Sequence, residues 1–297
     1  MEKFDQSQLK KLYRPQKNSH KGQNGKLMII GGSHLFHGAS LWALKVASRI
    51  VDMVFYSSTA ENNQLTQELK SKLYDFMAIS RDKIDDYIKE ADVVLLGSGL
   101  PREEGREERE ESTRELTQRL LSSYPDKKWV IDAGSLTEME PEWLLPLKGN
   151  VIVTPHKGEF ETLFKLKSQK SNLKTTTQNS KITEEIVQQM AGKYNCVILL
   201  KGATDIICSP FDSAQGEIRC VRISGGNVGM TKGGTGDVLA GLVAALSCKN
   251  DLFLAASAGS FINKKAGESL YEKVGPYFNA SDLADEIPAV MNHLINK

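Results

Sequence analysis

Apolar positions along the chain fall into short continuous runs, separated by longer segments in which apolar and polar residues follow a helical period. A run of consecutive apolar residues is typical of a strand that is covered on both faces. The first run ends in a glycine turn at 31–33, and a helical segment follows at 39–50. The sequence therefore predicts a mostly parallel sheet with helices on both faces. The expected strands are 26–30, 52–57, 92–96, 129–132, 151–154 and 196–200.

Three segments with few apolar residues lie outside this pattern. Residues 101–115 mix both charge signs at helical spacing, which favours a solvent-exposed helix face over a partner-binding acidic tail. Residues 165–181 are rich in Lys, Ser, Thr and Asn, and we expect a surface loop there. Residues 1–20 are expected to form a flexible arm. Because strands continue on both sides of the two insertions, we expect a single α/β domain over 21–297.

The composition excludes several classes of protein. With 38 Lys and Arg against 37 Asp and Glu, the net charge of +1 provides no general attraction for nucleic acid or an anionic membrane. No apolar stretch has the length of a membrane span or a signal peptide, so we expect a soluble, cytoplasmic protein. The cysteine spacing indicates neither a zinc site nor a redox motif. Buried thiols are therefore expected at Cys196, Cys208, Cys220 and Cys248.

The densest functional signal is the glycine-rich segment 224–246. Six glycines occur between Gly225 and Asp237, and an apolar helix is expected to begin near Gly236. A flexible backbone that leads into the positive end of a helix is typical of a phosphate site. The spacing matches neither a Walker A loop nor a dinucleotide fingerprint. Asp237 is either a favourable charge in the first helical turn or the base of a phosphoryl transfer.

Several short motifs, in order along the chain from residue 21 to 288, resemble a known family. The GGTGD segment at 233–237, preceded by Asn-x-Gly-Met at 227–230, resembles the ribokinase-like superfamily. The other motifs narrow the resemblance to the NAD(P)H-hydrate dehydratase family. They are KG at 21–22 leading to GGS at 31–33, HGA at 37–39, GSGL at 97–100, DAGSL at 132–136, TPHKGEF at 154–160, KGAT at 201–204 and ASDL at 280–283.

The resemblance implies an enzyme that repairs nicotinamide cofactors by removing water from S-NADHX and S-NADPHX, with ADP or ATP as co-substrate and nucleotide-bound Mg²⁺. It implies that Asp237 activates the ring hydroxyl, and that the amides of Gly233, Gly234, Thr235 and Gly236 hold the transferring phosphoryl group. Hydroxide is a poor leaving group, whereas phosphate is a good one. A kinase-like fold can therefore support a lyase reaction, without a metal site built by the protein itself.

Three further residues are expected to contact the hydrate together with Asp237. Ala39 matches the substrate-binding alanine of the family, although an alanine that merely starts a helix is also possible. Gly99 follows the strand at 92–96, at the edge where open α/β sheets bind ligands. His156 lies beyond the strand at 151–154, where the motif favours substrate contact over a structural role.

The segment KGATD at 201–205 matches the family segment that lines the adenosine side of the nucleotide, and Gly236 lies next to the phosphates. Lys201 either neutralises phosphate charge or solvates a strand end. Asn227 either orders phosphates and Mg²⁺-bound water or caps a turn. The expected nucleotide-binding residues are Lys201, Gly202, Ala203, Thr204, Asp205, Asn227, Gly233, Gly234, Thr235 and Gly236.

The chain departs from the family pattern at Ser40 and Ser98, which replace prolines, and at Lys232, which lies inside the glycine loop and could accommodate a longer polyphosphate. The resemblance also implies a separate epimerase that supplies the S hydrate, and a homo-oligomer. Two alternatives remain open. One is a ribokinase-like kinase that phosphorylates a sugar or vitamin, and the other is a nucleotide-binding regulator without turnover, which the carboxylate of Asp237 argues against.

Overall fold

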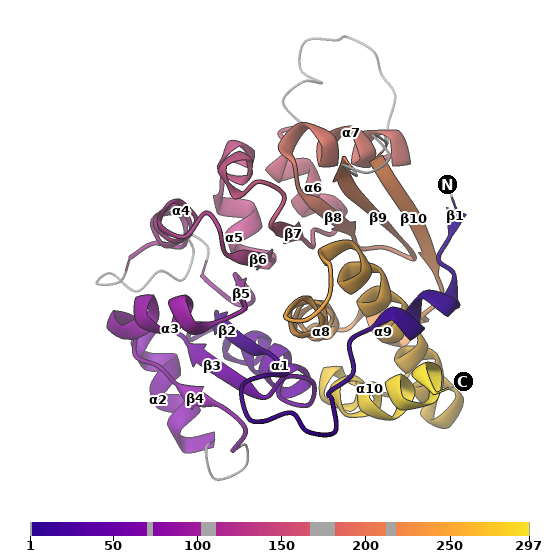
Figure 1. Cartoon of the computed structure of the whole chain (residues 1–297), viewed down its shortest axis with the longest axis horizontal. Coiled ribbons are helices and arrows are strands. Elements are labelled where there is room, and N and C mark those ends of the chain that lie inside the picture. Colours follow the sequence, from indigo (N-terminus) through magenta and orange to yellow (C-terminus); the bar gives the residue numbers. More distant parts are fainter. Residues whose placement is uncertain (1, 70–73, 102–110, 167–181, 212–217, 297) are drawn as a thin grey trace.

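In a computed structural model, residues 2–69, 74–101, 111–166, 182–211 and 218–296 are described, and within these ranges ten strands form one sheet (Figure 1). The strand order is β1-β10-β9-β8-β7-β6-β5-β2-β3-β4. The neighbours from β8 to β4 are all parallel. The strands are β1 (Glu2–Lys3), β2 (Lys26–Ile30), β3 (Met53–Ser57), β4 (Met77–Ala78), β5 (Val93–Leu96), β6 (Lys128–Ile131), β7 (Val151–Val153), β8 (Val197–Leu200), β9 (Thr204–Phe211) and β10 (Ile218–Ser224).

Helices cover both faces of the sheet. One face packs against α1, α8 and α9, and the other packs against α3 to α7. The last helix, α10, lies outside this first layer against α9 and α1, and α2 lies beside β4 (Figure 1). The helices are α1 (His37–Ala47), α2 (Ala60–Leu69), α3 (Ile84–Glu90), α4 (Thr113–Ser123), α5 (Ala133–Glu138), α6 (Lys157–Leu163), α7 (Glu184–Tyr194), α8 (Thr235–Ser247), α9 (Leu252–Val274) and α10 (Ala280–Ile295).

Alternate residues of the parallel strands enter opposite cores. In β2, Met28 and Ile30 belong to the core on one face, whereas Leu27 and Ile29 belong to the core on the other. Burial on both faces explains why these strands are apolar at consecutive positions. The predicted α/β fold is therefore confirmed, and the six predicted strands correspond to β2, β3, β5, β6, β7 and β8.

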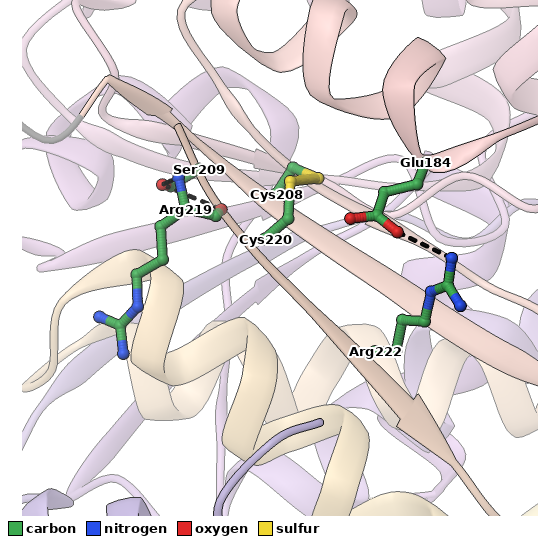
Figure 2. The surroundings of a disulfide bond; sticks show 6 residues. All are labelled: Glu184, Cys208, Ser209, Arg219, Cys220 and Arg222. Atoms are coloured by element: carbon green, nitrogen blue, oxygen red, sulfur yellow. Dashed lines mark hydrogen bonds and ion pairs between the residues drawn. A yellow bond between two sulfur atoms is a disulfide. The ribbon is translucent and has the colours of Figure 1, made fainter. Parts of the chain in front are cut away.

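The hairpin of β9 and β10 was not predicted from the sequence. β9 is antiparallel to both β8 and β10, and the two hairpin strands mix polar with apolar residues. Cys208 lies directly opposite Cys220 in this ladder, and the two form a disulfide (Figure 2). The expectation of four thiols is therefore wrong for this pair, because the pairing depends on a register that the spacing alone does not show. Cys196 and Cys248 are buried thiols.

Part of the segment expected to be a flexible arm packs on the molecule. β1 pairs in parallel with β10, and Leu9 and Leu12 are buried beside a 3-10 turn at Gln6–Lys11. Of the two insertions predicted at 101–115 and 165–181, residues 102–110 and 167–181 lie outside the described residues, and residues 113–115 of the first form the start of α4. Among the helices of the described part, none is both long and apolar enough to span a bilayer.

Candidate active site

The candidate site lies where the carboxyl ends of the central parallel strands meet the start of α8. The loops that follow β2, β5 and β6 touch one another here. The N–H of Gly32 donates to the carbonyl of Ser98 at 2.8 Å, and a Cβ on Gly97 would overlap the carbonyl oxygen of Asp132. Gly97 also has a φ of 118°, so the close approach requires glycine. Open α/β sheets bind ligands at this edge.

The glycine loop delivers the N-terminus of α8 to the same edge. Gly234 is the N-cap with a φ of 93°, and a Cβ there would overlap the ring of Trp42. Gly236 and Asp237 lie in the first turn. A Cβ on Gly236 would lie 3.4 Å from Nζ of Lys201. Because first-turn N–H groups have no partner within a helix, this end combines an anion site with a carboxylate and an ammonium group.

Two buried carboxylates hold the ammonium group of Lys201. Its Nζ lies 2.8 Å from Oδ1 of Asp132 and 3.9 Å from Oε2 of Glu159. Asp132 and Glu159 are 1% and 5% exposed. Thr154 Oγ1 donates a further hydrogen bond to Oδ1 of Asp132 at 2.8 Å. Lys201 therefore serves as the counter-ion of buried acids, a role that sequence reasoning did not assign to it.

Asp237 lies close to this cluster, and its ionisation responds to it. The pKa of Asp237 is raised from 3.8 to about 7, first by burial and then by the charge of Asp132, while Lys201 and a hydrogen bond with Ser98 oppose the rise. Burial alone would lower the pKa of Lys201, but Asp132 and Glu159 raise it above its ordinary value. Near neutral pH, Lys201 is charged and Asp237 is poised between its two protonation states, as a general base requires.

A cavity of about 590 Å³ opens beside the cluster. This volume is in the range of small-molecule sites. His156, which we expected on the substrate side, also lines it. Thr204, Gly233 and Gly234 lie close to lining residues in sequence but are not part of the lining. The expected nucleotide-binding residues that line the cavity are Lys201, Gly202, Ala203, Asp205, Asn227, Thr235 and Gly236.

Two expected substrate residues, Ala39 and Gly99, contact each other at the carboxyl ends of the strands, beside this cavity. A Cβ on Gly99 would lie 2.8 Å from Cβ of Ala39 and 2.7 Å from the carbonyl oxygen of Phe36. Gly99 has a φ of 76°, which favours glycine. The structure thus brings the start of α1 against the loop after β5. The exposed side chains of Leu35 and Phe36 precede α1 at this point.

A second lysine, Lys264 of α9, is buried and also lines the cavity. Its Nζ donates to the carbonyl oxygens of Gly202 and Ala203 at 3.0 and 3.3 Å, and it lies 3.3 Å from Oδ1 of Asp205. Oδ1 of Asp205 also accepts from the N–H of Gly202, and Oδ2 accepts from Ser260 Oγ. These contacts fix the backbone of the turn between β8 and β9.

His156 and Asn227 cap local structure. Nδ1 of His156 accepts from the N–H of Glu159 at 3.2 Å at the start of α6, although its side chain remains 57% exposed. Oδ1 of Asn227 accepts from the N–H of Gly229 at 2.9 Å, and its Nδ2 donates to the carbonyl of Gly267 at 2.7 Å. The structure therefore gives Asn227 the turn-capping role, and leaves the His156 ring accessible from the cavity.

Sequence reasoning missed four polar residues of this site. Asp132 and Glu159 stand inside the motifs at 132–136 and 154–160, but neither received a role. Ser98 was noted only as a replacement, and Lys264 was not noted. The available signal was a carboxylate directly after an apolar strand, and a lysine inside an otherwise apolar stretch of helix.

Comparisons with known proteins agree with this geometry. The chain is 36% identical over 288 residues to the bifunctional NAD(P)H-hydrate repair enzyme of Methanocaldococcus jannaschii, covering 95% of this chain and 51% of that protein. It is 33% identical to the ADP-dependent (S)-NAD(P)H-hydrate dehydratase of Nitrosopumilus maritimus, covering 92% of this chain and 90% of the relative. The chain thus spans about half the length of the bifunctional relatives that it matches.

Solved structures share the fold. A ribokinase-like superfamily protein of Enterococcus faecalis superimposes with a TM-score of 0.82 at 19% identity, covering 100% of this chain and 97% of that one. The ADP/ATP-dependent NAD(P)H-hydrate dehydratase of Bacillus subtilis, co-crystallised with ATP and Mg²⁺, gives 0.75 at 22% identity, covering 99% and 98%. The profile of the NAD(P)H-hydrate dehydratase family matches residues 27–289. The chain therefore belongs to the NAD(P)H-hydrate dehydratase family, on a ribokinase-like fold.

Proposed function

We propose that this chain is an ADP- or ATP-dependent (S)-NAD(P)H-hydrate dehydratase. One observation carries the proposal: the carboxyl group of Asp237, with a pKa raised to about 7, lies in the first turn of α8 beside the glycine loop. A carboxylate repels phosphate, so nucleotide binding alone does not explain it there, whereas proton transfer does. The Nitrosopumilus maritimus relative, which bears this activity in its name, aligns along nearly the whole chain.

In the proposed reaction, the ring hydroxyl of the hydrate attacks the terminal phosphorus of the nucleotide while Asp237 accepts the hydroxyl proton. The substrate becomes a phosphate ester, and ADP leaves as AMP or ATP leaves as ADP. The lone pair of the ring nitrogen then expels phosphate, and the adjacent ring carbon loses a proton. The first-turn amides of α8 stabilise the negative charge of the transferring group.

The two ligands are proposed to meet at Asp237. The hydrate lies on the side of Ala39 and Gly99, whose contact joins α1 to the loop after β5. The nucleotide lies in the cavity lined by Lys201, Gly202, Ala203, Asp205, Asn227, Thr235 and Gly236, with the backbone amides of the adjoining glycine loop next to its phosphates. The exposed ring of His156 lines the same cavity, where it is proposed to contact the hydrate.

ADP is the proposed donor, with Mg²⁺ bound to the nucleotide. Lys232, the residue that could accommodate a longer polyphosphate, donates instead to the carbonyls of Pro276 and Phe278. Asp132 and Glu159 are already paired with Lys201, and the described residues contain no group of three His, Cys, Asp or Glu able to hold a metal. The ion would therefore be held mainly by phosphate oxygens, where it offsets phosphate charge.

Two features of the proposal concern other chains. A separate epimerase is proposed to supply the S hydrate, and the dehydratase is proposed to assemble as a homo-oligomer. Light scattering on the purified chain measures the second feature, and a monomer at micromolar concentration would exclude it.

The deciding experiment incubates the purified protein with S-NADHX, Mg²⁺ and either ADP or ATP. Absorbance of reduced nicotinamide and released phosphate are followed together. We expect equal amounts of both products, no reaction without nucleotide, and a higher kcat/KM for ADP than for ATP. A stable phosphate ester formed in a parallel incubation with a sugar or vitamin alcohol, with no recovery of reduced nicotinamide from S-NADHX, would support a kinase instead.

A further inference from the structure

Ser98, in the turn after β5, lies between two carboxylates. Its side chain is fully buried, and its hydroxyl donates to Oδ2 of Asp132 at 3.5 Å. A hydrogen bond with the same side chain also lowers the pKa of Asp237. The backbone at this position is fixed, because the carbonyl of Ser98 accepts from Gly32 and leaves no room for a Cβ on Gly31. The hydroxyl therefore cannot move far from either acid.

The two oxygens of Asp132 have different partners. Oδ1 accepts from Lys201 and Thr154, both at 2.8 Å. Oδ2 accepts a hydrogen bond from the hydroxyl of Ser98 at 3.5 Å. Ser98 is thus the hydroxyl that links the fixed ion pair of Asp132 and Lys201 to Asp237.

A serine hydroxyl has one proton to donate and can also accept, so it can serve either protonation state of a neighbouring acid. While Asp237 is ionised, the Ser98 hydroxyl donates to it. Once Asp237 is protonated, its O–H can donate to Ser98 Oγ, and the serine proton can then turn towards Oδ2 of Asp132. Neither state leaves a buried polar hydrogen without an acceptor, which would be costly.

We propose that Ser98 is a positioning residue whose hydroxyl turns from Asp237 to Asp132 when Asp237 takes up the proton of the substrate, and turns back when the proton is released. No bond to oxygen is broken at Ser98, and the proton gained by Asp237 is the one lost by the substrate. The inference rests on the proposed role of Asp237 as the base.

The titratable groups around Asp237 are Asp132 after β6, Lys201 after β8 and, through Lys201, Glu159 in α6; the ring of His156 borders the same cavity. The hydrogen bond with Ser98 lowers the pKa of Asp237 against the effects of burial and of Asp132. Removing the hydroxyl should therefore favour the protonated acid and weaken the base.

The test compares Ser98→Ala with Ser247→Ala. Ser247 is also fully buried, and its hydroxyl donates to the carbonyl of Val243 within α8, away from the site. Carbon-13 NMR of labelled aspartate follows the titration of Asp237 without substrate, with Asp237→Asn to assign the signal. In Ser98→Ala we expect the midpoint to rise by about one pH unit, since a hydrogen bond to a charged group is lost.

Activity should follow the same shift. For Ser98→Ala we expect kcat to fall about tenfold at pH 6 and less than twofold at pH 9, and Ser98→Thr to restore much of the loss because it keeps a hydroxyl. The inference would be overturned if neither the NMR titration midpoint of Asp237 nor the low-pH side of the kcat profile moved more in Ser98→Ala than in Ser247→Ala. If Ser98→Ala does not fold, Ser98→Cys, a weak donor of similar size, must show a shift in the same direction.

The two readouts separate this inference from the proposed function. A shifted NMR midpoint in a protein that does not dehydrate NADHX leaves the link between Ser98 and Asp237 standing and removes the reaction. Normal dehydration with an unshifted midpoint and pH profile in Ser98→Ala keeps the reaction and removes the link.

Discussion

Two lysines, Lys201 and Lys264, line the same cavity, and their surroundings differ. Lys201 lies among carboxylates, and two of its acidic neighbours are almost fully buried. Lys264 instead contacts two backbone carbonyl groups and one carboxylate, Asp205, which also accepts hydrogen bonds from other groups. The same residue type is therefore placed in an acidic cluster at one end and in a turn at the other.

The difference shows how one cavity can support proton transfer at one end and nucleotide binding at the other. At the Lys201 end, three acids share one ammonium group, so the acid that is held least firmly, Asp237, has its pKa raised to about 7 and can exchange a proton. At the Lys264 end, Asp205 has Lys264 as its counter-charge, and the contacts fix the shape of the backbone. We therefore expect changes at the first end to affect proton transfer, and changes at the second to affect nucleotide affinity.

The largest expected effect comes from Asp237→Asn, which keeps the shape of the side chain but removes its basicity. We expect kcat to fall by about 10² to 10⁴, which corresponds to roughly 2.7 to 5.4 kcal/mol of barrier. Nucleotide affinity should be retained or slightly improved, because a negative charge beside the phosphates is lost. Turnover, nucleotide Kd and Tm are measured on one preparation, and a near-normal kcat would remove Asp237 from the mechanism.

The next effect comes from exchanging each lysine for methionine. Lys201→Met should lower the free energy of unfolding by about 3 to 5 kcal/mol, because it leaves Asp132 buried without a counter-ion. Lys264→Met should cost only about 1 to 3 kcal/mol, since Asp205 keeps its bonds from Gly202 and Ser260, while the Kd for ADP rises. Urea unfolding and calorimetric titration with ADP measure both variants.

The double variant Asp132→Asn with Lys201→Met provides the matched control for this pair. Removing both charges should recover part of the stability that Lys201→Met loses, because no unpaired buried charge remains. Equal stability losses in the two single lysine variants would contradict the difference drawn between the two ends.

A smaller effect should follow from removing the disulfide with Cys208→Ser and Cys220→Ser. The bond links the two strands of the hairpin (Figure 2). The other end of the hairpin adjoins the turn held by Lys264. We expect a loss of about 2 to 3 kcal/mol of stability, in line with the short loop that it closes. Thermal unfolding with and without reductant tests this, and the double variant should no longer respond to reductant. A shift in the pH midpoint of kcat would contradict the separation of the two ends.

The smallest effect concerns the dependence of stability on pH. Because the pKa of Asp237 is raised from 3.8 to about 7, the folded protein binds its proton more tightly than the unfolded chain does. This stabilisation is complete below about pH 4 and is lost as the pH rises through 7, by about 1 to 2 kcal/mol after allowance for solvent screening. Denaturant unfolding between pH 4 and 8 measures the slope.

Asp237→Asn serves as the control in this measurement, because it cannot titrate. Its stability should fall less between pH 4 and 8 than that of the wild type, and at pH 8 it should be the more stable protein. An identical pH slope in both proteins would show that the burial of Asp237 has no cost for folding. Activity should rise over the same range in which this stability is lost.

The parallel part of the fold, and the glycine loop that leads into α8, could be predicted from the sequence. Strands buried on both faces, such as β2, carry a continuous apolar run that needs no partner to be recognised. The glycine loop and Asp237 are contiguous, so their proximity to the start of α8 is a local property. The hairpin of β9 and β10 carries no such run, and its disulfide could not be inferred without the register.

By itself, the sequence determined what depends on neighbouring residues: the apolar period of strands and helices, the flexible glycine loop and the motifs that identify the family. Only the tertiary structure decided which charges meet. Lys201 and Asp132 are 69 positions apart, and Ser98 and Asp132 are 34 apart. Their encounter depends on the order of β5, β6, β7 and β8 in the sheet. Burial and proximity set the pKa of Asp237, and both arise only when distant strand ends are packed together.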